Sequence, residues 1–211
     1  IGILAHDSML GRDTPSRGLE LTAQYVADEF ERFGLRPGGT DGGWFQRYPI
    51  SRRRLDLGGS TVALEAGSVS ATARLDAGAR HVGGEIPGQP VGGQAVLVGG
   101  PVTPEAVAGM GLRDKVVLYI HDYSRTIPAH ATQVARALRV SGARAIVAVS
   151  NLDSAAFAAR VPRAAPERYG MDLRIGAPPS VEVSEASVAP VLRAAGVKLA
   201  EVRRATAAVS R

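Results

Sequence analysis

Lys115-Val-Val-Leu-Tyr-Ile-His121 contains a continuous apolar run rich in β-branched residues, Val116–Ile120, and Ala145-Ile-Val-Ala-Val149 is a second run of the same kind. Such runs are typical of strands that are covered on both faces. Between them, the apolar residues of Ala131–Leu138 fall at the helical spacing i, i+3, i+4 and i+7, and Gly142 follows where a left-handed residue commonly ends a helix. The segment from Lys115 to Asn151 therefore predicts a strand–helix–strand unit with parallel strands and a right-handed connection.

The rest of the chain adds elements of both kinds around this unit. An apolar stripe predicts a helix from Arg17 to about Phe33, and Ser184 is placed to cap a second helix near the end of the chain. Extended segments between Trp44 and Leu75 outnumber the helices, which argues against a fully parallel, doubly wound sheet. We therefore expect a mixed α/β fold: a curved or barrel-like β-sheet that contains the β–α–β unit, with an extra N-terminal helix.

Three regions give further expectations about local structure. Trp44–Ile50 alternates in the manner of a strand. Leu152–Pro179 carries several prolines and is expected to be a long surface excursion. The Val197–Arg211 tail has no clear period, and no secondary structure is predicted there.

Composition excludes several classes of function. The 211 residues include no cysteine, so disulfides and thiolate metal sites are excluded. The net charge of +5 comes from scattered arginines with few aromatic residues, which indicates a solvated surface and no nucleic-acid partner. No apolar run approaches the ~20 residues of a membrane span.

Sequence motifs for the common catalytic sites are missing. The chain has no glycine-rich dinucleotide motif or phosphate-binding loop, no Gly-x-Ser-x-Gly nucleophile elbow and no His-Glu-x-x-His zinc helix. We therefore assign no catalytic residue and no metal ligand in this chain, and we expect no cofactor in it.

One group of polar residues follows the first strand of the β–α–β unit: His121, Asp122, Tyr123 and His130. The carboxyl ends of parallel strands are where α/β folds tend to bind ligands, so these residues form the candidate binding site. The alternative is a polar loop whose side chains hold the turn and cap the following helix.

The N-terminal part of the chain resembles the beginning of M28-family zinc aminopeptidases. That segment of the family has a Gly-Arg pair, a helix ending in Gly-Leu-x-Pro, and an aromatic-Phe-Gln strand. The matching positions here are Gly11-Arg12, the helix Leu21–Phe30, Gly34-Leu-Arg-Pro37 and Trp44-Phe-Gln46.

The later part resembles the protease-associated (PA) domain that is inserted in such peptidases. PA domains show a Gly-Lys-Val-Val-Leu strand, an alanine-rich helix and a Gly-Ala-x-Ala-Val strand. The matching segments here are Leu112–Ile120, Ala135–Val147 and the returning strand Pro179–Ser184, with Asp114 in place of the usual glycine.

The resemblance implies an accessory piece of a metallopeptidase. In M28 peptidases the metals and the general base come from the domain after the PA insert, through a His-x-Asp motif and a Glu-Glu pair, and this chain contains neither. The implied organisation is an N-terminal helical segment (1–43), a PA-like domain (44–196) and a tail (197–211) that leads to a catalytic domain.

That organisation sets the expected function and partners. We expect a non-catalytic part, concerned with substrate access or protein interaction, of a secreted or cell-envelope aminopeptidase whose zinc lies in the catalytic domain. Its partners would be that domain and a peptide or protein substrate. The alternative is a small-molecule-binding α/β module that uses the His121–His130 loop.

Overall fold

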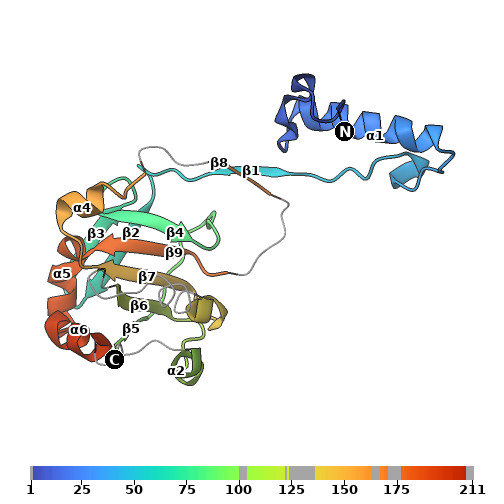
Figure 1. Cartoon of the computed structure of the whole chain (residues 1–211). Helices are drawn as coiled ribbons and strands as arrows, with labels where there is room; N and C mark the ends of the chain where they lie inside the picture. The colour runs from blue at the N-terminus through green and yellow to red at the C-terminus, as the bar shows by residue number, and fades with distance from the viewer. Residues whose placement is uncertain are drawn as a thin grey trace. The chain divides into compact units, whose positions relative to one another are not determined.

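The chain folds into two units in the computed structural model, which describes residues 2–99, 104–121, 123, 136–162, 167–170 and 177–207 (Figure 1). Unit 1 comprises Ile1–Arg54 and Glu167–Arg174. Unit 2 comprises Leu55–Pro166 and Ile175–Arg211, and it contains the β–α–β segment.

Unit 2 is built on a five-stranded sheet with the strand order β4-β9-β7-β6-β5. The strands β5, β6, β7 and β9 are parallel, and β4 pairs antiparallel with β9 at one edge. The predicted parallel pair of the β–α–β unit is confirmed, because β6 and β7 are hydrogen-bonded neighbours. The strand bounds are β4 Ala79–Gly83, β5 Ala95–Val98, β6 Val116–His121, β7 Ala145–Ser150 and β9 Ser180–Ser184.

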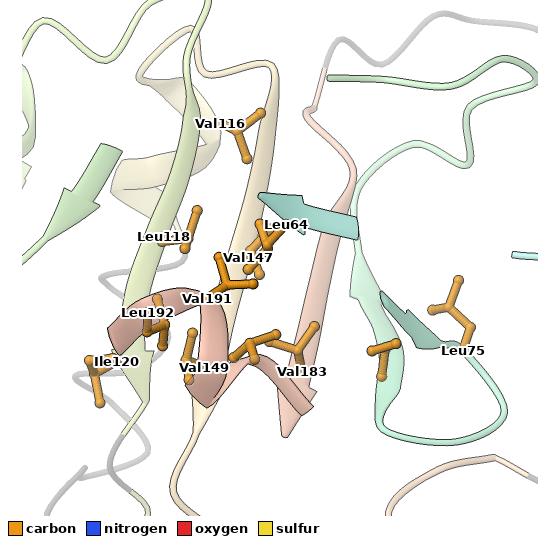
Figure 2. Packing of buried hydrophobic residues seen from close by; sticks show 13 residues of the cluster. Leu64, Leu75, Val116, Leu118, Ile120, Val147, Val149, Val183, Val191 and Leu192 are labelled. Carbon is orange, nitrogen blue, oxygen red and sulfur yellow. The ribbon is translucent and has the colours of Figure 1, made fainter. Parts of the chain in front are cut away.

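One face of the sheet is covered by a β-hairpin and a helix. The hairpin is β2 (Thr61–Ala66) with β3 (Val69–Arg74), and the helix is α5 (Glu185–Ala194). Figure 2 shows the larger buried side chains of this layer, where α5 faces aliphatic residues of β6, β7 and β9. These residues form the main hydrophobic core of the molecule.

The opposite face carries a second apolar cluster at the β5–β6–β7 side. The short helix α2 (Pro104–Gly109) and the helical residues 136–140 contribute to it, with Val107 and Leu138 buried. Leu138 belongs to the apolar stripe predicted for the connecting helix, and the stripe residues 131–135 lie outside the described residues. At the β4–β9 side, the same face carries charged and polar side chains.

The predicted cap at Ser184 is confirmed, and the turn at Asp114 has a suitable residue type. Ser184 caps α5, because its hydroxyl accepts a hydrogen bond from the N–H of Ser187. Asp114, the residue that replaces a glycine in the PA-like motif, has φ of 62°. Aspartate tolerates this left-handed conformation better than most residues, so the replacement is compatible with the turn.

Unit 1 consists of helices η1 (Asp7–Arg12), α1 (Arg17–Arg32) and η2 (Thr40–Gly42), and a two-stranded ribbon of β1 (Ser51–Arg54) and β8 (Glu167–Gly170). The predicted N-terminal helix is confirmed as α1, which begins after the cap Ser16. Gly18 lets η1 approach closely, since a Cβ there would lie 1.9 Å from the Met9 carbonyl oxygen.

Several local predictions need correction. Trp44–Ile50 forms no strand, and the first strand begins at Ser51. The region Leu152–Pro179 is not only a surface excursion, because it contains α4 (Ser154–Ala158), with buried Phe157, and β8. The tail contains a helix, α6 (Leu199–Ala207).

The mixed α/β class is confirmed, and the sheets in the described part of the chain form no closed barrel. Among the helices that the structure describes, none has the length and apolar character needed to cross a membrane.

Candidate functional site

A row of paired residues crosses the face of the sheet that carries the polar side chains. Arg80 of β4 lies opposite Glu182 of β9, Glu182 opposite Ala148 of β7, and Ala148 opposite Tyr119 of β6. Directly opposed residues in neighbouring strands share a face, so these four side chains project to the same side. Ala148 is small and leaves room between Glu182 and Tyr119.

Glu182 is the most deeply buried charged residue of this row, with a side chain that is 1% exposed. Arg80, which is 22% exposed, donates a hydrogen bond of 2.6 Å to it from Nε, and its Nη2 lies 2.5 Å from it as an ion-pair contact. Both contacts go to the same oxygen, Oε2. The other oxygen, Oε1, has no hydrogen-bond partner among the described residues.

His121 and Tyr123 stand at the carboxyl end of β6, beside this ion pair. Their rings are stacked, with centroids 4.2 Å apart and planes 13° apart. The Tyr123 hydroxyl accepts a hydrogen bond of 3.2 Å from Arg80, and Nδ1 of His121 lies 3.8 Å from Oε1 of Glu182. Arg80, His121, Tyr123 and Glu182 are called the Glu182 cluster below.

Two residues from the β7 side hold Tyr123 in place. The N–H of Tyr123 donates to Oδ1 of Asn151 at 3.0 Å, and the N–H of Asn151 donates to the His121 carbonyl oxygen at 3.4 Å. The exposed Arg160 guanidinium lies 4.3 Å from the centre of the Tyr123 ring, which is cation–π geometry. Together these contacts hold Tyr123, just beyond the end of β6.

The environment fixes the charge of most members of the cluster. Burial alone would lower the pKa of Arg80, but the charge and hydrogen bond of Glu182 outweigh it and raise that pKa. Burial, followed by the hydrogen bond and charge of Glu182, raises the pKa of Tyr123. Arg80 is therefore cationic and Tyr123 neutral near pH 7, and His121 is the member whose residue type titrates closest to neutrality.

Tyr119 should make the folded protein sensitive to alkali. Burial, and then the charges of Glu182 and Tyr123, raise the pKa of Tyr119 to about 12, above the unfolded value of about 10. The folded state thus holds this proton more tightly, so its stabilising effect is complete below about pH 10 and disappears as pH rises to about 12. Spectrophotometric titration at 295 nm and unfolding at pH 9–12 should show this step in the wild type and lose it in Tyr119→Phe. Removal of the exposed phenol in Tyr48→Phe should leave it in place.

The structure brings together two of the four residues of the predicted binding site. His121 and Tyr123 are in ring contact, whereas Asp122 and His130 lie outside the described residues. Sequence reasoning missed Arg80 and Glu182. A usable signal existed for Glu182, because it is the single charged residue in the strand Ser-Val-Glu-Val-Ser.

The Glu182 cluster offers hydrogen-bond donors, an aromatic stack and one imidazole, which suit recognition of a partner. In the part of the chain that the structure describes, no three His, Asp or Glu side chains lie together as metal ligands would.

Unit 1 has a second surface feature, a hollow of about 400 Å³ between the end of α1 and the segment that follows it. Phe30 and Trp44 form part of its wall, with ring centroids 6.2 Å apart. The other lining residues are Leu35, Arg36, Gly38, Gly39 and Gln46. The hollow is therefore mainly apolar with one cation.

Comparison with known proteins gives no family for this chain. No protein-family model matches it, and no curated protein matches it. Two solved structures are similar to it at 14% identity: an aminopeptidase from Aneurinibacillus sp. strain AM-1 and a peptidase M28 precursor from Shewanella amazonensis SB2B. The first match covers 94% of this chain and 42% of that chain with a TM-score of 0.39, and the second covers 85% and 40% with a TM-score of 0.34. The chain thus spans less than half the length of either protein, and these likenesses identify neither an activity nor a site in it.

Proposed function

We propose that this chain is a non-catalytic accessory part of an M28-type metallo-aminopeptidase that is secreted or exported. Unit 2 would act as the PA-like domain and would contact substrate or partner proteins through its surface. The zinc and the bond chemistry would belong to the catalytic domain of the same protein. The sequence resemblance supports this assignment through the order of its motifs along the chain.

The single structural observation that carries the proposal is the exposed apolar face of unit 1. Of residues 2–54, only Gly18 and Ala27 are buried. At the C-terminal end of α1, Phe30 is 44% exposed and Phe33 is 66% exposed, and Leu35 just beyond it is 54% exposed. A segment with so small a core and so much clustered apolar surface is typical of a piece completed by another part of the protein.

The stripe on α1 shows where the missing contact would lie. Its first half, including Leu19 and Ala23, is partly covered by the chain itself, and η1 packs against α1 near Gly18. Its second half ends at Phe30 and Phe33, next to the hollow lined by Trp44. We assign the catalytic domain as the occupant of this face, because the resemblance places α1 in the N-terminal segment of such peptidases.

Hydrogen exchange tests the docking directly. In the isolated chain, the amides at the Phe30 end of α1 should exchange quickly, because few buried contacts hold this turn. In the whole protein they should exchange about tenfold more slowly or slower, which corresponds to about 1.4 kcal/mol of docking free energy. Phe30→Asp with Phe33→Asp should abolish the slowing, whereas Glu31→Ala, on the exposed surface of the same helix, should preserve it.

Metal analysis and activity assays test the rest of the proposal. The isolated chain should bind no stoichiometric zinc and should not hydrolyse aminoacyl p-nitroanilides. Metal-dependent turnover by the isolated chain, or strong protection of α1 in a demonstrated monomer, would contradict the proposal. Saturable thermal stabilisation by a metabolite, lost in His121→Ala, would instead favour the small-molecule-binding alternative.

A further inference from the structure

We infer that His121 and Glu182 form a proton-operated contact: the protonated imidazole donates from Nδ1 to Oε1 of Glu182 and fixes the position of Tyr123. The two oxygens of the Glu182 carboxylate differ in their contacts. Arg80 uses its donors on Oε2, and Oε1 is buried with no hydrogen-bond partner among the described residues. A buried carboxylate oxygen without a donor is unfavourable, so a nearby group that can supply one is favoured.

His121 is the titratable group closest to that oxygen for which a contact is described. Its Nδ1 is 3.8 Å from Oε1, which is too long for a hydrogen bond and short enough that a small ring movement would close it. Protonation ensures that Nδ1 carries a hydrogen and adds a positive charge that the carboxylate attracts. The His121 side chain is 20% exposed, so the imidazole can exchange its proton with solvent.

Some neighbouring groups oppose the protonation of His121, and others favour it. Arg80 on β4 opposes a second cation, but its guanidinium is already paired with Oε2 and with the Tyr123 hydroxyl. Tyr123, stacked on His121, favours a cation through its ring face, although Arg160 uses the same kind of contact. Tyr119, stacked at 6.4 Å, remains neutral below about pH 10 because its pKa is raised to about 12. The negative charge of Glu182, 3.8 Å from Nδ1, favours the protonated form of His121.

The contact links proton binding to the position of Tyr123. Tyr123 is stacked on His121, and its backbone is tied to Asn151, whose own N–H donates to the His121 carbonyl. Closing the His121–Glu182 gap would therefore hold Tyr123 more firmly. If this surface contacts substrate or partners, which rests on the proposed function, that contact would be firmer in an acidic environment than at pH 8.

A pH series on the folded chain tests the contact whether or not the proposed function is right. A histidine that gains a partner stabilises the fold fully below its unfolded value of about 6.5, and this stability is lost as pH rises through the folded value. The melting temperature should therefore fall by about 2–4 °C more between pH 5.5 and pH 8 in the wild type than in His121→Asn. His6→Asn removes an exposed histidine of unit 1 and should keep the wild-type difference.

A direct readout separates this contact from a general effect of substitution. The NMR titration midpoint of the His121 Cε1–H resonance should move to lower pH in Glu182→Gln. A double-mutant cycle of His121→Asn and Glu182→Gln should show a coupling energy at pH 5.5 that vanishes at pH 8. If Glu182→Gln does not fold, the comparison of wild type with His121→Asn still decides. Parallel pH profiles for those two proteins, or an unchanged His121 resonance in Glu182→Gln, would overturn the inference.

Discussion

Arg80→Met should reduce the free energy of unfolding by about 3–5 kcal/mol at pH 7, because it leaves a buried carboxylate without its cation. Glu182 is 1% exposed, so water cannot replace the hydrogen bond and the ion-pair contact that Arg80 supplies. Glu182→Gln should cost less, since Arg80 is 22% exposed and can turn toward solvent. Urea unfolding followed by circular dichroism would measure both losses.

Two further variants show whether burial is the cause. Arg74→Met breaks an ion pair with Asp76 at the end of the hairpin strand β3, but there the arginine is 59% exposed, and no change in midpoint is expected. Replacing Arg80 and Glu182 together with methionine should recover most of the stability lost in Arg80→Met, because no buried charge then remains uncompensated. Equal effects of Arg80→Met and Arg74→Met would show that Glu182 finds water or another donor.

The strands of the β–α–β segment were predictable because the burial of apolar side chains determines them. The run from Val116 to Ile120 is apolar at every position, which suits a strand covered on both faces, and the structure buries it in that way. The Ser184 cap was also predictable, because a cap depends on a few neighbouring residues.

Predictions failed where pairing is long-range or the pattern is short. Trp44–Ile50 alternates like a strand but pairs with no strand in the described part of the chain, whereas the arginine-rich Ser51–Arg54 becomes a strand because it pairs with Glu167–Gly170. Local sequence does not encode such a partner. The α6 helix was missed because its apolar residues are too few to give a period over nine positions.

The candidate site shows the same limit. The sequence drew attention to His121 and Tyr123 through their place after a buried strand. It could not show that Arg80 and Glu182, which are far apart along the chain, meet beside them. The antiparallel register of β4 with β9 sets Arg80 against Glu182, and the parallel registers of β9 with β7 and of β7 with β6 bring this pair to the end of β6.

Leu192→Ala should reduce the free energy of unfolding by about 2–5 kcal/mol, because it opens a cavity between α5 and the sheet. Leu192 is 3% exposed, and Figure 2 shows it with Val191 on the side of α5 that faces Ile120 and Leu118. The helix itself is a weak former, since Pro190 removes one of its internal hydrogen bonds. Packing must therefore supply most of its stability, which places the expected loss in the upper half of the range.

Matched variants make this expectation specific to the cavity. Leu192→Met keeps the volume and should cost less than about 1.5 kcal/mol. Val140→Ala removes an aliphatic side chain that is 81% exposed and should change stability by no more than about 0.5 kcal/mol. If Leu192→Ala is no worse than Leu192→Met, then α5 can settle into the vacated space. The rigid covering of this face of β6 and β7 would then have to come from the β2–β3 hairpin.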